Sequence, residues 1–156
     1  MGVINGLNPI GGSHWLRQDI EIPQSWNGKE ATLRLGCIVD ADSVYVNGVF
    51  VGTTSYQYPP RIYRIPAGIL KSGKNNITVR IISNGGQPGF VQEKPYKIIC
   101  DNEEINLKQK WKYRLGAPMP PAPEMMFFWY KPVCLYNAMI APLQNYSIRG
   151  SAMVSR

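Results

Sequence analysis

The strongest constraint on the fold is a series of short segments, between residues 14 and 115, in which apolar and polar residues alternate. The segment 14–22 shows the pattern, with Leu16, Ile20 and Ile22 on one face and Trp15, Arg17, Asp19 and Glu21 on the other. A period of two indicates a strand with one buried face, because successive side chains of a strand point in opposite directions. No amphipathic helix of useful length interrupts the series. The sequence therefore predicts an all-β, jelly-roll-like β-sandwich of roughly eight or nine strands.

The sharpest local signal is the pair Asn47-Gly48, which lies between the β-rich runs 44–46 and 49–51. Both residue types tolerate a positive φ, and a type I′ turn requires a positive φ at its two central positions. We therefore expect a tight hairpin with Asn47 and Gly48 at its turn.

The same alternation predicts further strands over residues 31–39, 61–65, 76–83, 96–100, 104–107 and 110–115. In the first of these, Cys37 shares its side with Leu33, Leu35 and Val39, so we expect it in the core. Residues 66–70 are expected to form a single helical turn. Residues 116–123 contain four prolines, which cannot extend a sheet, so the domain should end there.

These features divide the chain into a linker at residues 1–12, the β-sandwich at 13–115, a proline-rich linker at 116–134 and a further segment at 135–150. Residues 135–146 predict a helix, with Pro142 near an end or a kink. An apolar helix beyond a linker needs a partner to cover it. We therefore expect the tail to belong to another domain or to self-associate. Its apolar residues are Met125, Met126, Phe127, Phe128, Trp129, Tyr130, Met139, Ile140 and Leu143.

The net charge of +7 requires a nucleic-acid partner to be considered. The basic residues are spread over separate segments and no nucleic-acid-binding signature accompanies them, so we predict no nucleic-acid partner. No long apolar run predicts a membrane span. With one histidine and no CxxC pair, we expect no metal and no cofactor. A disulfide between Cys37 and Cys100 is possible.

Six residues are candidates for contact with a ligand: Trp15, Asp40, Asp42, Tyr56, Tyr58 and Arg61. Aromatic rings can stack on sugars, and Tyr56, Tyr58 and Arg61 lie in a loop, where exposed side chains are well placed for binding. The alternatives are that the two aspartates accept hydrogen bonds from backbone amides in a turn, and that the aromatic rings belong to the core or its rim.

Several short motifs occur in an order that resembles a known family. They are Trp15-Leu16-Arg17, Leu33-Arg34-Leu35-Gly36, Asp40-Ala41-Asp42, Tyr45-Val46-Asn47-Gly48 and Ile77-Thr78-Val79-Arg80. Together they resemble the sugar-binding jelly-roll (galactose-binding-domain-like) domains of β-galactosidases and β-glucuronidases. The Asp-Ala-Asp variant, and the tail stretch Leu135-Tyr136-Asn137-Ala138-Met139-Ile140-Ala141-Pro142-Leu143, are more similar to sialate O-acetylesterases. In that family the tail stretch re-enters the catalytic SGNH-type domain.

This resemblance implies an accessory, carbohydrate-binding-like domain of a sialate O-acetylesterase. The serine, aspartate and histidine of the family's catalytic triad lie outside the matching stretch, so we predict no catalytic residue here, while Asn137 would lie near the parent's active site. Residues 151–156 match nothing in the pattern. The alternatives are a sugar-binding module of a β-galactosidase-like glycoside hydrolase and a purely structural spacer. The implied partners are a glycan or sialoglycoconjugate, reached through the parent enzyme, and the parent's own catalytic domain, in the periplasm or outside the cell.

Overall fold

The computed structural model describes residues 10–85, 87–120 and 136–145. The chain divides into two units, Met1–Ala122 and Pro123–Arg156. In the first unit the strands are β1 Gly12–Ile22, β2 Ala31–Leu35, β3 Ile38–Val39, β4 Ala41–Val46, β5 Val49–Thr54, β6 Ile62–Ile65, β7 Gly73–Ser83, β8 Gly89–Phe90, β9 Tyr96–Cys100, β10 Glu103–Asn106 and β11 Lys112–Pro118, with one short 3₁₀ helix, η1 Gln24–Trp26.

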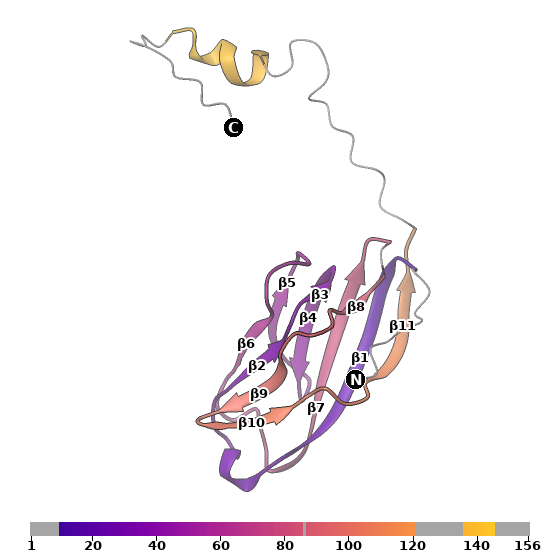
Figure 1. Ribbon diagram of the computed structural model, residues 1–156, viewed down its shortest axis with the longest axis vertical. Helices are drawn as coiled ribbons and strands as arrows, with labels where there is room; N and C mark the ends of the chain where they lie inside the picture. The colour runs from indigo at the N-terminus through magenta and orange to yellow at the C-terminus, as the bar shows by residue number, and fades with distance from the viewer. Residues whose placement is uncertain (1–9, 86, 121–135, 146–156) are drawn as a thin grey trace. The chain divides into compact units, whose positions relative to one another are not determined.

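The strands form two main antiparallel sheets and a small third one (Figure 1). The five-stranded sheet has the order β11-β1-β7-β4-β5, the four-stranded sheet the order β10-β9-β2-β6, and β3 pairs with β8. The buried apolar side chains of both main sheets form one core, which includes Leu16, Leu33, Val44, Ile77 and Ile98. The prediction of an all-β, jelly-roll-like sandwich is confirmed.

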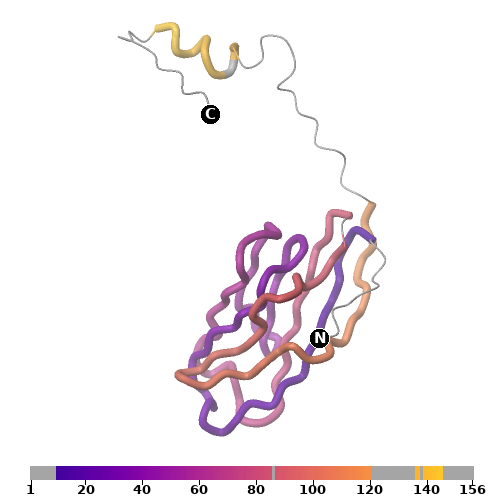
Figure 2. Tube along the Cα trace, viewed as in Figure 1, coloured from indigo at the N-terminus to yellow at the C-terminus, as the bar shows by residue number. Residues whose placement is uncertain are grey.

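The two longest strands, β1 and β7, alternate between buried and solvent-facing residues along most of their length, as the sequence predicts. Strands β1 and β11, from opposite ends of the domain sequence, lie side by side at one edge of the five-stranded sheet (Figure 2). The hairpin between β4 and β5 is also confirmed, with φ of 50° at Asn47 and 81° at Gly48. The Asn47 side chain does more than form the turn, because it donates to Ile69 O at 2.9 Å and accepts from the backbone N–H of Asn76 at 2.9 Å.

The predicted strand over residues 31–39 is interrupted at Gly36, which has a φ of +54°. The alternation changes phase there, so that Ile38 is fully buried while Cys37 and Val39 are only partly buried. The expectation that Cys37 and Val39 point into the core with Leu33 and Leu35 is therefore wrong. Cys37 instead donates a hydrogen bond to the Tyr58 carbonyl at 3.3 Å, and Cys37 and Cys100 are both free thiols.

Two further expectations need correction. Residues 66–70 form a turn, with Ile69 N–H donating to Pro66 O at 3.4 Å, and no helix. Strand β11 begins later than expected and continues to Pro118, beyond the predicted end of the domain. A proline is tolerated there because β11 is an edge strand, and a missing N–H on the solvent side breaks no ladder.

In the second unit, the structure describes a π-helix, η3 Tyr136–Ile140, followed by a 3₁₀ helix, η4 Ala141–Leu143. Asn137, Met139, Ile140 and Leu143 are exposed there. The remainder of the predicted helix, most of the proline-rich linker and the run from Met125 to Tyr130 lie outside the described residues. None of the helices that the structure describes has the length and apolar character needed to cross a membrane.

Candidate functional site

A buried arginine organises one end of the sandwich. The Arg61 side chain has no exposed surface, and all five of its N–H donors have acceptors. The guanidinium donates to Asp42 Oδ1 at 2.6 Å and to the carbonyls of Gln57, Pro59, Ile38 and Asp40 at 2.7 to 3.1 Å. It therefore ties the connection between β5 and β6 to β3, to β4 and to the residue between them.

Asp42 is the anionic partner of this arginine and is equally buried. Its second oxygen, Oδ2, accepts a hydrogen bond from the Tyr63 hydroxyl at 2.5 Å, and Thr54 in turn bonds that hydroxyl at 2.8 Å. Burial raises the pKa of the Asp42 carboxyl above its ordinary value, and the hydrogen bonds from Tyr63 and Arg61 oppose that rise. Burial, followed by the bond to Asp42, also raises the pKa of Tyr63.

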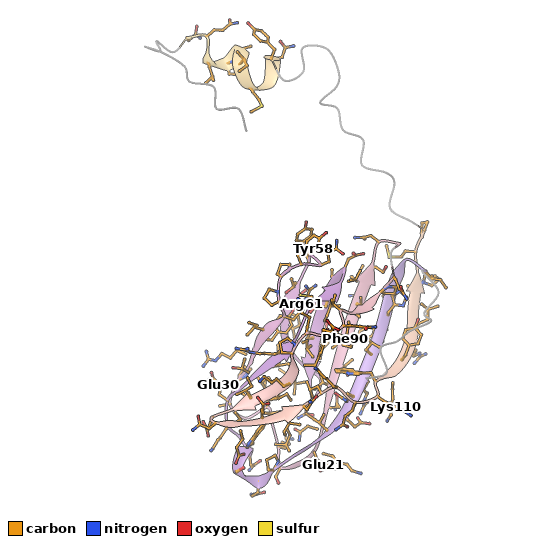
Figure 3. The ribbon with its side chains drawn as sticks, in the orientation of Figure 1. Glu21, Glu30, Tyr58, Arg61, Phe90 and Lys110 are labelled. Carbon is orange, nitrogen blue, oxygen red and sulfur yellow. The ribbon has the colours of Figure 1, made fainter. Side chains whose placement is uncertain are left out.

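The residues that this network holds in place include an exposed aromatic pair. Tyr56 is 59% exposed and Tyr58 is 68% exposed, and their rings meet edge to face with centroids 5.1 Å apart. Figure 3 shows Tyr58 at the end of the sandwich, with Arg61 inside the domain below it. Two of the Arg61 hydrogen bonds go to carbonyls within this same loop, at Gln57 and Pro59. The pair is therefore an aromatic surface on a loop with a fixed backbone.

A hollow of about 290 Å³ lies beside Tyr58. Its lining includes Arg34 and Lys94 as well as Cys37 and Tyr58. The Nε atom of Arg34 is buried and has no hydrogen-bond partner among the described residues, which is a costly state for a polar group unless a ligand or water completes it. The hollow thus combines an aromatic ring with two cationic side chains, a set that suits a hydroxylated or acidic sugar.

The structure brings five of the six predicted ligand residues to this end of the domain, but in different roles. Tyr56 and Tyr58 face solvent, whereas Asp42 and Arg61 are buried and bind each other, so direct ligand contact by those two is not supported. Asp40 Oδ2 accepts the backbone N–H of Asn84 at 2.9 Å, which is a bond to a backbone amide distant in the sequence and not the local turn given as the alternative.

The sixth ligand candidate, Trp15, and the residue predicted near the parent's active site, Asn137, lie elsewhere. Trp15 is on the outer face of the five-stranded sheet, paired in register with Arg80 of β7 and Arg114 of β11. Asn137 is exposed and belongs to the second unit. Sequence reasoning missed Arg34 and Lys94. Arg34 lies between Leu33 and Leu35 in β2, so the alternation could have identified it as a cation on the outer side of that strand. Nothing in the local sequence indicates that Lys94 lines the same hollow as Tyr58.

His14, the one histidine of the chain, takes no part in this site. Its side chain is buried, and its two ring nitrogens are bonded to the Tyr113 hydroxyl at 3.0 Å and to the Ile10 carbonyl at 2.9 Å. Among the described residues, no group of three or more His, Cys, Asp or Glu side chains is arranged to hold a metal ion. The groups that the site presents are ring faces and cationic donors, which can bind a ligand.

Comparison with known proteins gives a structural likeness. No protein-family model matches the sequence, and neither does any curated protein. Among solved structures, the α-L-rhamnosidase of Streptomyces avermitilis complexed with L-rhamnose is similar over 70% of this chain and 11% of its own, with 18% identity and a TM-score of 0.54. A β-glucuronidase of Ruminococcus gnavus, complexed with uronic isofagomine, is similar over 47% of this chain and 13% of its own, with 24% identity and a TM-score of 0.44.

The solved neighbours named here are glycosidases, and the likeness at these identities concerns the fold alone. The chain spans only 11 to 13% of the length of these two structures. The likeness to the rhamnosidase agrees with the predicted type of β-sandwich.

Proposed function

We propose that this β-sandwich is an accessory carbohydrate-binding domain of a larger carbohydrate-processing hydrolase, and that the loop carrying Tyr56 and Tyr58 binds a sugar. The observation that carries the proposal is the pair of exposed tyrosines on a loop anchored by a buried arginine. Exposed rings in fixed positions lose little conformational entropy when they bind, which favours their use as contact surfaces.

The chemistry of the hollow beside Tyr58 supports the same proposal. A sugar ring presents C–H groups that pack on an aromatic face and hydroxyls that accept hydrogen bonds at its edge. Tyr58 supplies the face, while Arg34 and Lys94 supply donors at the edge of the hollow. The side chains of Arg34 and Lys94 carry only hydrogen-bond donors, which suits sugar oxygens as acceptors.

The parent enzyme has two candidate classes. The glycosidase neighbours favour a glycoside hydrolase, in line with the resemblance to β-galactosidase and β-glucuronidase jelly-roll domains. The second candidate is a sialate O-acetylesterase, supported by the similarity of residues 135–143 to the stretch of those esterases that re-enters the catalytic domain. A full-length parent that hydrolyses O-acetylated sialic acid, and leaves nitrophenyl glycosides intact, would favour the esterase; the reverse result would favour the glycosidase.

Sugar binding is tested on the purified chain by glycan-array screening followed by calorimetric titration. Replacing Tyr58 with Ala should weaken the best glycan by about tenfold, since loss of a stacking ring commonly costs one to two kcal/mol. The matched control is Phe50→Ala, which removes another exposed aromatic, 53% exposed, on the hairpin between β4 and β5. Equal weakening by both variants, or no glycan binding by the unaltered chain, would leave a structural spacer as the better description.

A further inference from the structure

A second surface with ligand-binding chemistry lies on the outer face of the five-stranded sheet. Strands β11, β1 and β7 place Arg114, Trp15 and Arg80 side by side in one cross-strand row. The next row along the same face holds Lys112, Arg17 and Thr78. Neighbouring strands lie about 4.8 Å apart, so each row presents its side chains at close, regular intervals.

The aromatic element of this face is Trp15. The Arg80 guanidinium lies over its ring, with Cζ 5.9 Å from the centroid, and Tyr45 lies beside it with ring centroids 6.5 Å apart. A hollow of about 660 Å³ runs along Trp15, and Arg17, Lys112 and Arg114 contribute to its lining. The hollow therefore has an aromatic floor and a cationic border.

The charge of this face is strongly unbalanced. Asp19 is the carboxylate that partners its cations, accepting Arg17 Nε at 3.1 Å and Lys112 Nζ at 2.7 Å. Those two bonds, led by the one from Lys112, lower the pKa of Asp19. Arg80 and Arg114 have no acidic partner among the residues that the structure describes. Three cations thus line the hollow, and a fourth, Arg80, lies over the Trp15 ring. Asp19 pairs with two of these four.

We propose that this hollow binds an acidic glycan, a sugar chain that carries carboxylate or sulfate groups, and that this site is separate from the one at Tyr58. The pyranose rings would pack against Trp15, and the anionic groups would pair with Arg114 and with Arg80. An arginine without a carboxylate partner binds an incoming anion better than a paired one does, because its N–H donors are free. Two of these donors match the two oxygens of a carboxylate.

The choice of a glycan over other anionic partners rests on the shape and chemistry of the face. The cations lie on a sheet around one half-buried tryptophan, which supplies one stacking floor. Proteins that bind single-stranded nucleic acid without sequence preference use a series of stacking aromatic residues along a basic groove. The second aromatic residue in the lining of this hollow, Tyr113, is instead stacked on His14 and hydrogen-bonded to it.

The test compares three probes of similar length on the purified full chain: an oligogalacturonate, a sulfated heparin-type oligosaccharide and a neutral oligosaccharide. We expect one or both acidic probes to bind at least about tenfold more tightly than the neutral probe at low salt, and to weaken as salt is added. The probe that binds better identifies carboxylate or sulfate as the preferred group. Equal binding of the neutral probe would overturn the proposal.

Variants then locate the site. Arg114→Gln and Trp15→Ala should each weaken the acidic probe by about tenfold or more. Lys71→Gln removes an exposed cation that does not line the hollow and should leave binding unchanged. Equal weakening by Lys71→Gln would show unspecific attraction to a basic protein, and tighter binding of a single-stranded oligonucleotide would assign the face to nucleic acid. Either result overturns the proposal.

Discussion

The two candidate surfaces use similar residues in opposite ways. At the end of the sandwich, Arg61 and Asp42 are both inside the protein and bind each other, while a pair of tyrosines and Lys94 reach solvent. On the outer sheet face the aromatic residue, Trp15, is half buried. Two of the arginines around it, Arg80 and Arg114, have no acidic partner within the described part of the chain. The first surface keeps one ion pair inside the protein, whereas the second leaves most of its cations in solvent.

This difference separates structural from ligand-binding roles for residues of one type. Removing two charges from water is costly, and the cost is recovered only when the ions meet each other and further hydrogen bonds complete them. Arg61 meets that condition with five acceptors. Arg114 remains in water, where its charge is solvated at little cost and stays available to an incoming anion. Burial and pairing, more than residue type, decide which arginine can bind a ligand.

The largest expected effect follows from removing one member of the buried pair. Asp42→Ala should lower the free energy of unfolding by about 3–5 kcal/mol, because it leaves Arg61 charged, buried and without its anion. Urea titration followed by circular dichroism measures the loss. The matched control is Asp19→Ala, which removes an exposed carboxylate that also pairs with two residues and should leave the urea midpoint nearly unchanged. A similar loss of unfolding free energy in both variants would contradict the distinction between buried and exposed charges.

The role of Arg61 also marks a limit of sequence reasoning. A loop arginine beside tyrosines and prolines predicts an exposed binding residue, and the pattern of local residues contains no sign of burial. The structure buries it because four carbonyls from two separate segments, at Gln57, Pro59, Ile38 and Asp40, converge on one guanidinium. That convergence depends on the tertiary fold, and the residues next to Arg61 in the sequence give no sign of it.

A second prediction concerns the packing that holds Tyr63 against Asp42. A Cβ at Gly52 would clash with the Tyr63 ring, so Gly52→Ala should displace the ring and weaken its hydrogen bond to Asp42. Overpacking of this kind typically costs about 1–3 kcal/mol. The measurement is again the urea midpoint. In a Tyr63→Leu background the same alanine should cost much less, because the clashing ring is absent; an undiminished cost would place the strain elsewhere.

Regular elements were the part of the fold open to prediction. Period-two alternation located β1 and β7 with their inner faces, and Asn47-Gly48 located the hairpin. The errors arose where one residue changed the geometry. Gly36 turns the chain and reverses the phase of Cys37, and Pro118 is accepted because β11 happens to be an edge strand. Neither the turn at Gly36 nor the edge position of β11 can be read from residue types alone.

The smallest expected effect concerns the outer face of the five-stranded sheet. Arg80→Gln removes the guanidinium over Trp15 and should lower the free energy of unfolding by about 0.5–1 kcal/mol, the size of a cation–π contact at an exposed site. Thermal melting resolves a change of that size. Arg80→Lys should recover part of the loss, because an ammonium group keeps the charge over the ring but stacks less well. A loss as large as that of Asp42→Ala would mean that Arg80 supports the fold as Arg61 does. The cations of the outer face would then stabilise the fold, and the two candidate surfaces would no longer differ in the role of their arginines.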